Sequence, residues 1–244
     1  MIMNINTIII EDEILKNGNT NLISDSNLTS GSQIFAIGDS HSIFFYNSLR
    51  IKEHWFGCNG LPISIYTLLT TELNLYNIGN VIGNKHEQYN IKKNDYVIFF
   101  YGFNDIQKNI NKYAKNEWEK EIQSLFSRYI EYINELSKKY KIFPIISCIY
   151  PNPRNGAKGQ NPYGTLEERV EYTIFANMFL ESLCQNNNIK FLNIYKYITD
   201  KYGFIKNEFT TDQIHLDYNN NALRDYVESE VFCAVNEIEC SRIK

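Results

Sequence analysis

Short, continuous apolar runs alternate along this chain with long amphipathic patterns, and this alternation restricts the fold more than any other feature. The apolar runs cover residues 33–37, 96–101, 141–150 and 189–194. Each run has the length of a strand, and a strand that is apolar at nearly every position is typical of a sheet covered on both faces. We therefore expect these runs to form the buried strands of a sheet.

The segments between the apolar runs have helical periodicity. It is clearest over residues 114–140, where large apolar side chains recur every three or four positions: Trp118, Ile122, Leu125, Tyr129, Ile133, Leu136 and Tyr140. Similar patterns cover 166–186 and 219–239. Strands that alternate with long helices predict an α/β protein, a three-layer α/β/α sandwich with a mostly parallel central sheet. In such sheets the loops after the carboxyl ends of the strands hold the functional site.

The size and composition of the chain indicate one globular unit. Its 244 residues are 43% hydrophobic and 21% charged, so we expect a single domain over residues 1–244, with 1–32 as an N-terminal entry segment. The net charge of −4, without a basic run, argues against a nucleic-acid partner. No apolar run reaches the roughly 18 residues of a membrane span, and the N-terminus lacks a signal-peptide pattern. We expect no membrane partner and a cytoplasmic location.

Neither the cysteines nor the histidines have the spacing of a metal site. The cysteines are odd in number, widely spaced and without a CxxC pair: Cys58, Cys148, Cys184, Cys233 and Cys240. We interpret them as reduced thiols. The histidines form no HExxH pattern, and residues 79–85 lack the spacing of a phosphate-binding loop. We expect no metal and no cofactor, and the oligomeric state stays open.

Three short polar motifs lie where an α/β site is expected. Gly-Asp-Ser-His at 38–41 follows the first apolar run, Gly-Phe-Asn-Asp at 102–105 follows the second, and Asp-Gln-Ile-His at 212–215 lies near the C-terminus. A serine hydroxyl becomes a nucleophile when a histidine, oriented by a carboxylate, takes its proton. Ser40 is the candidate nucleophile.

The partners of this serine come from the other two motifs. Asp212 and His215 are three residues apart, so their side chains can lie side by side and the carboxylate can orient the imidazole. The amide of Asn104 and the backbone N–H of Ser40 are candidate donors to an oxyanion. Taken singly, Asp39 and Ser40 would more often cap a helix, and it is the joint pattern that favours catalysis.

These blocks, in the order Ser, Asn, Asp, His, resemble the SGNH subset of the GDSL hydrolase superfamily over about residues 34–216. The resemblance implies a flavodoxin-like sandwich that hydrolyses esters. It implies that Ser40 is the nucleophile and that Asn104 is an oxyanion donor. It also makes Asp212 the orienting acid and His215 the base.

A glycine N–H completes the oxyanion hole in that family. We favour Gly57, because His-Trp-Phe-Gly at 54–57 looks like the His-x-x-Gly segment of SGNH-like proteins from glycan-assembly genes, whereas Gly60 and Gly79 stay open. The same subgroup resemblance extends over residues 162–172.

The resulting hypothesis is a serine esterase that removes a small acyl group, O-acetyl first of all, from a carbohydrate. The same residues could instead serve a carbohydrate O-acetyltransferase. An idle glycan-binding module and a lipid or thioester hydrolase are further alternatives. The partner we expect is a small-molecule or glycan ester. We also expect five residues to bind the substrate, because they lie beside the motifs or in a loop after a strand: Asp39, His41, Trp55, Tyr101 and Arg154.

Overall fold

The computed structural model describes residues 31–242 except 47, 56–62, 77, 83–84, 111, 113, 154–162 and 213. Its centre is a five-stranded sheet with the order β2-β1-β5-β6-β7. The strands are β1 (Ile34–Gly38), β2 (Ile51–Trp55), β5 (Tyr96–Phe100), β6 (Phe143–Ser147) and β7 (Lys190–Leu192). Every neighbouring pair is parallel. A separate antiparallel pair consists of β3 (Ile78–Ile82) and β4 (Lys85–Tyr89).

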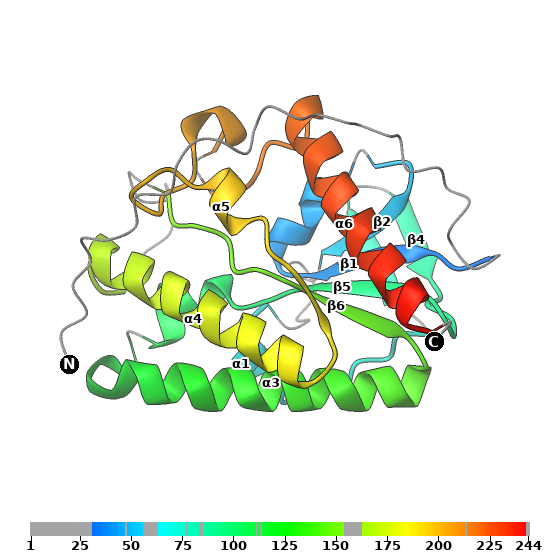
Figure 1. Cartoon of the computed structure of the whole chain (residues 1–244), viewed down its shortest axis with the longest axis horizontal. Helices are drawn as coiled ribbons and strands as arrows, with labels where there is room; N and C mark the ends of the chain where they lie inside the picture. Colours follow the sequence, from blue (N-terminus) through cyan, green and yellow to red (C-terminus); the bar gives the residue numbers. More distant parts are fainter. Residues whose placement is uncertain are drawn as a thin grey trace.

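Three long helices cover the sheet. They are α3 (Trp118–Tyr140), α4 (Leu166–Asn186) and α6 (Asn221–Arg242). In Figure 1 α3 and α4 lie together on one side of the strands and α6 crosses the other side, so the α/β/α sandwich predicted from the sequence is confirmed. The shorter helices are η2 (Ser40–Phe45), α1 (Ile65–Leu68), η3 (Asp105–Ile110), η4 (Lys115–Glu117), α5 (Tyr195–Ile198) and η5 (Asn207–Phe209). Within the described residues no helix is both long and apolar enough to cross a membrane.

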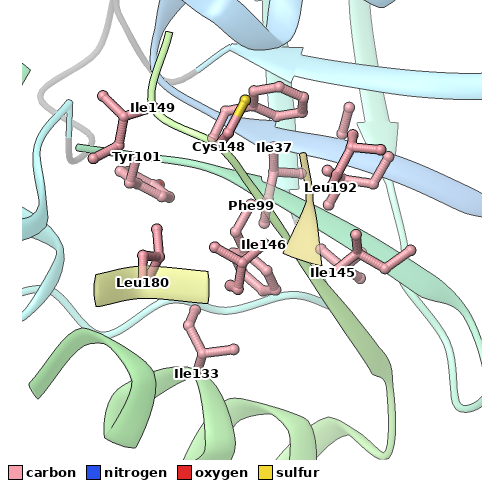
Figure 2. Close-up of a cluster of buried hydrophobic side chains, with 14 of the residues drawn as sticks. Ile37, Phe99, Tyr101, Ile133, Ile145, Ile146, Cys148, Ile149, Leu180 and Leu192 are labelled. Atoms are coloured by element: carbon pink, nitrogen blue, oxygen red, sulfur yellow. The ribbon is translucent and has the colours of Figure 1, made fainter. Parts of the chain in front are cut away.

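The elements follow from the sequence in simple ways. All residues of β1 and β5 are buried, as their unbroken apolar runs require. Figure 2 shows side chains of the central strands packed against Ile133 of α3 and Leu180 of α4. Helix α4 begins at a capping box, in which the Thr165 hydroxyl and the Glu168 carboxylate each accept from the other residue's backbone N–H. The core therefore lies between the sheet and its helices.

Gly38, the last residue of β1, lets this strand approach β5 closely. Its φ is +144°, and a Cβ atom placed there would lie 2.1 Å from the carbonyl oxygen of Phe100. The N–H of the next residue, Asp39, donates to that same oxygen at 2.9 Å. Glycine is required here because any side chain would collide with backbone, and the contact fixes the start of the loop that carries Ser40.

Replacing Gly38 with alanine should therefore destabilise the fold through this collision. Gly31→Ala is the matched control, because Gly31 also has a positive φ but nothing within 4 Å of its hypothetical Cβ. We expect Gly38→Ala to lower the free energy of unfolding by about 1–3 kcal/mol more than Gly31→Ala does. Urea denaturation measures both. Equal losses in the two variants would contradict the close approach of β1 to β5.

Candidate active site

The turn after β1 places Ser40 at the start of η2, where it is half-buried. Asp39 caps η2, and its carboxylate accepts from the backbone N–H of His41 at 2.9 Å. The Ser42 hydroxyl donates to the Asp39 carbonyl, also at 2.9 Å. The capping role considered for Asp39 is thus present in the structure, while the neighbouring Ser40 side chain has a different partner.

That partner is His215, and the structure brings Ser40, His215 and Asp212 together. The Ser40 Oγ lies 2.8 Å from His215 Nε2, and His215 Nδ1 lies 2.6 Å from an Asp212 carboxylate oxygen. The side chains thus form a continuous chain from hydroxyl to imidazole to carboxylate. In this arrangement His215 can take the serine proton while Asp212 holds the other ring nitrogen protonated.

The loop that carries Asp212 and His215 is held at both ends. Thr210 and Leu216 form an antiparallel bridge that joins its two ends. The second oxygen of Asp212 accepts from the backbone N–H groups of Ile214 and His215 at 2.8 and 2.7 Å. Partial burial by itself would raise the pKa of Asp212, but the hydrogen bonds from the His215 ring and these N–H groups outweigh it and hold the pKa below its ordinary value. Asp212 is therefore a carboxylate at neutral pH.

Asn104 and Asp105 follow β5, the strand beside β1, as the sequence rule predicted. The Asn104 side-chain amide donates one N–H to the Ile63 carbonyl at 2.8 Å. Asp105 is fully buried and accepts from the backbone N–H groups of Ile65 and Tyr66 at 2.7 and 3.4 Å. Burial raises the pKa of Asp105 to about 6, although these hydrogen bonds oppose the rise. Together the pair ties the start of α1 to the end of β5.

His41 and Asp39 are buried beside the triad. His41 is 3% exposed, and its ring lies 5.2 Å from that of His215. Burial lowers the pKa of His41 well below its ordinary value; repulsion from His215 adds to this and attraction to Asp212 opposes it. Burial also raises the pKa of Asp39 to about 8, against the hydrogen bond from His41 and with the help of Asp105. A neutral imidazole and a protonated carboxyl thus flank Ser40 in the chain and are buried.

The expectation that the Tyr101 side chain binds substrate is wrong, because that side chain is 2% exposed and lies in the core (Figure 2). The same expectation is wrong for the side chains of Asp39 and His41, which are 1% and 3% exposed, and Asp39 serves as a cap instead. The sequence rule selected strand ends correctly but could not tell which side chains turn inward.

The remaining predicted residues are placed less completely. Gly57, Gly60 and Arg154 lie outside the described residues. Gly79 lies in β3 opposite Gln88, and Trp55 ends β2 opposite Gly38. Among the described residues no three His, Cys, Asp or Glu side chains gather in a way that could hold a metal ion.

Two kinds of neighbour were missed by sequence reasoning. The Tyr150 ring lies 4.7 Å from that of His41. Tyr150 is the last residue of the apolar run 141–150, which contains β6, so the same strand-end rule could have found it. Tyr46 and Tyr218 form an aromatic pair, with ring centroids 5.9 Å apart, near Ser40 and His215 in sequence. The first lies one residue beyond η2, a helix whose residues no periodicity had marked.

Comparison with known proteins identifies the fold. No family model and no curated protein matches the chain. A GDSL-like lipase from Bacteroides thetaiotaomicron is 16% identical, with 85% of this chain and 89% of that chain aligned and a TM-score of 0.55. A protein described as an acylhydrolase from Bacteroides fragilis is 16% identical, with 91% and 97% aligned and a TM-score of 0.55. The chain therefore has the fold of the GDSL-like hydrolases, as its motifs predicted.

The buried carboxyl of Asp39 should make the stability of the fold depend on pH. Its pKa is about 8 in the folded chain and 3.8 ordinarily, so its contribution to stability is complete below about pH 4 and is lost as the pH rises to about 8. In that interval this group lowers the free energy of unfolding by up to about 1.4 kcal/mol per pH unit. Asp39→Asn keeps the oxygen that accepts from His41 and has no proton to lose.

We therefore expect the stability of Asp39→Asn, relative to the unmodified chain, to increase steadily between pH 4 and pH 8 in urea denaturation. Asp225→Asn is the control, because it removes the same formal charge at an exposed position of α6. If the free energies of unfolding of Asp39→Asn and the unmodified chain change in parallel with pH across this range, folding does not raise the pKa of Asp39.

Proposed function

We propose that this chain is a serine esterase in which Ser40, His215 and Asp212 form the catalytic triad. The observation that carries the proposal is the hydrogen-bond chain between these side chains, with joining distances of 2.8 and 2.6 Å. The GDSL-like lipase and acylhydrolase folds found in the comparison agree with ester hydrolysis. No cofactor takes part in the chemistry.

The reaction follows from the positions of these groups. Ser40 Oγ attacks the ester carbonyl carbon while its proton moves to His215 Nε2, and Asp212 stabilises the imidazolium that results. The carbonyl oxygen becomes an oxyanion that accepts from the Ser40 backbone N–H and the side-chain amide of Asn104. The imidazolium then protonates the departing alcohol. Water, activated by the same histidine, releases the acid and restores Ser40.

Substitutions in the triad should separate these roles. Ser40→Ala should abolish turnover of an aryl acetate and labelling by a fluorophosphonate, because both need the hydroxyl. Asp212→Asn should reduce kcat by up to about 10⁴-fold, since the imidazole loses its orientation. Asn104→Ala should lower kcat by about 10²–10³-fold, the usual effect of removing one oxyanion donor.

Ser229→Ala is the matched control for the first of these substitutions. It removes an exposed serine hydroxyl on α6 and leaves the site intact. Steady-state kinetics and probe labelling measure every variant. Undiminished turnover or labelling in Ser40→Ala would show that another residue is the nucleophile.

The alcohol part of the ester, we propose, is a carbohydrate that stacks on Tyr46. Every third residue along η2 is less buried than its neighbours: Ser40 and Ile43 are half-buried and Tyr46 is exposed, so the three share one face, as positions three apart do on a 3₁₀ helix. Tyr46 is 52% exposed, and its ring meets that of Tyr218 at 66°. Tyr218 follows His215 by three residues, so both catalytic loops contribute to this aromatic pair, a surface that suits the apolar face of a sugar ring.

Removal of the Tyr46 ring should weaken sugar binding alone. We expect Tyr46→Ala to raise KM for an O-acetylated sugar by about five- to tenfold, with little change for p-nitrophenyl acetate, and Tyr46→Trp to restore it. Tyr76→Ala is the control, because Tyr76 is 53% exposed and also meets another ring edge-on, that of Tyr140, at the end of α3. Equal KM values for Tyr46→Ala and Tyr76→Ala would rule out the sugar surface. A preference for long-chain nitrophenyl esters would count against acetyl as the acyl group.

A further inference from the structure

A small polar cavity lies beside the proposed triad, and the mechanism does not use it. It is lined by these residues: Asp39, His41, Phe100, Tyr101, Phe103, Cys148, Ile149 and Tyr150. The volume open to the centre of a water-sized sphere is about 10 Å³. A cavity needs roughly 10–15 Å³ by this measure to hold one water molecule, so this cavity has the size for one.

Polar groups without partners surround this cavity. Both ring nitrogens of His41 and the hydroxyls of Tyr101 and Tyr150 are buried and have no hydrogen-bond partner among the residues that the structure describes. The three side chains are only 2–3% exposed. A buried polar group left without a partner is costly, and internal water molecules typically satisfy about three such groups. The lining thus offers the number of partners that one water molecule needs.

The cavity is also connected to the catalytic histidine. The His41 ring packs edge-on against Phe103 at 4.3 Å and against Tyr150 at 4.7 Å, and its other neighbour is the His215 ring at 5.2 Å. Asp39, protonated at neutral pH, adds an O–H donor to the same lining. A contact that fixes the orientation of the His41 ring therefore also fixes a group that lies beside the His215 ring.

We propose that this cavity binds one structural water molecule that bridges His41 to the hydroxyls of Tyr101 and Tyr150, and that His41, held in this way, is a positioning residue for His215. The water site itself is independent of the proposed function. The positioning role rests on it, because it assigns His41 an effect on the reaction. The two parts are therefore tested by separate measurements.

Tyrosine-to-phenylalanine substitutions test the water site without any activity assay. If a water molecule accepts from or donates to the hydroxyls, Tyr101→Phe and Tyr150→Phe each lose a hydrogen bond and should lower Tm by about 2–4 °C. Tyr140→Phe is the reference for a bonded hydroxyl, since Tyr140 donates to the Leu73 carbonyl at 2.8 Å. Tyr129→Phe is the reference for an unpartnered one, because the buried Tyr129 hydroxyl has no partner within the described part of the chain and Tyr129 does not line the cavity.

The Tm changes of Tyr101→Phe and Tyr150→Phe are compared with those of the two reference variants. Losses like that of Tyr140→Phe support the water site. An unchanged or raised Tm, like that expected of Tyr129→Phe, would show that the cavity is dry and would overturn the proposal. Because Tm is measured on the full chain without substrate, this result holds whether or not the chain proves to be an esterase.

The positioning role is tested by two His41 variants with p-nitrophenyl acetate. His41→Phe cannot bond to the water molecule and should lower kcat by about tenfold at unchanged KM, because misplacement of a catalytic group affects the chemical step. His41→Gln keeps a donor and an acceptor and should restore most of kcat. Equal kcat values for the two variants would remove the positioning role. If Ser40→Ala were also fully active, the failure would belong to the proposed function instead.

Discussion

The imidazole of His215 joins two parts of the chain that lie 175 positions apart. Its bond to Ser40 requires that β1 end beside β5, which the missing side chain of Gly38 permits. Its bond to Asp212 lies in the loop whose ends are joined by the bridge between Thr210 and Leu216. The sandwich supplies the first condition, because parallel strands bring their carboxyl ends to one edge of the sheet. The stability of the fold and the geometry of the site therefore depend on the same few backbone contacts.

Much of the fold could be predicted from hydrophobic pattern because its strands are buried on both faces. The run at 96–101 and the helix at 166–186 correspond closely to β5 and α4. Strand β2 escaped prediction, because it reads Ile-Lys-Glu-His-Trp and lies at the edge of the sheet, where one neighbour suffices and no apolar run is needed. Strand β4, which reads Lys-His-Glu-Gln-Tyr, is similarly polar. A hydrophobic pattern identifies strands that are buried on both faces, and strands at the edge of a sheet show little of that pattern.

The site divides in the same way. The order of the motifs and the strand-end rule led to Ser40, Asp212 and His215, which the structure brings together. Neither could reveal that Tyr101 points into the core, since the inward or outward direction of a residue just past a strand depends on the local backbone. The exposure of Tyr46 could not be predicted either, because no sequence pattern indicated the 3₁₀ helix at Ser40–Phe45 that precedes it. Beside Ser40, the side chains of Asp39 and His41 are buried, whereas the ring of Tyr46 is exposed.

The crystal structure of the chain after reaction with a phosphonate ester tests the central claim most directly. The account predicts phosphorus bonded to Ser40 Oγ, with His215 Nε2 within hydrogen-bond reach of that oxygen. It also predicts that the phosphoryl oxygen accepts from the Ser40 N–H and the Asn104 amide, as an oxyanion would. Phosphorus on a different side chain would contradict the account. So would a phosphoryl oxygen that points away from both donors.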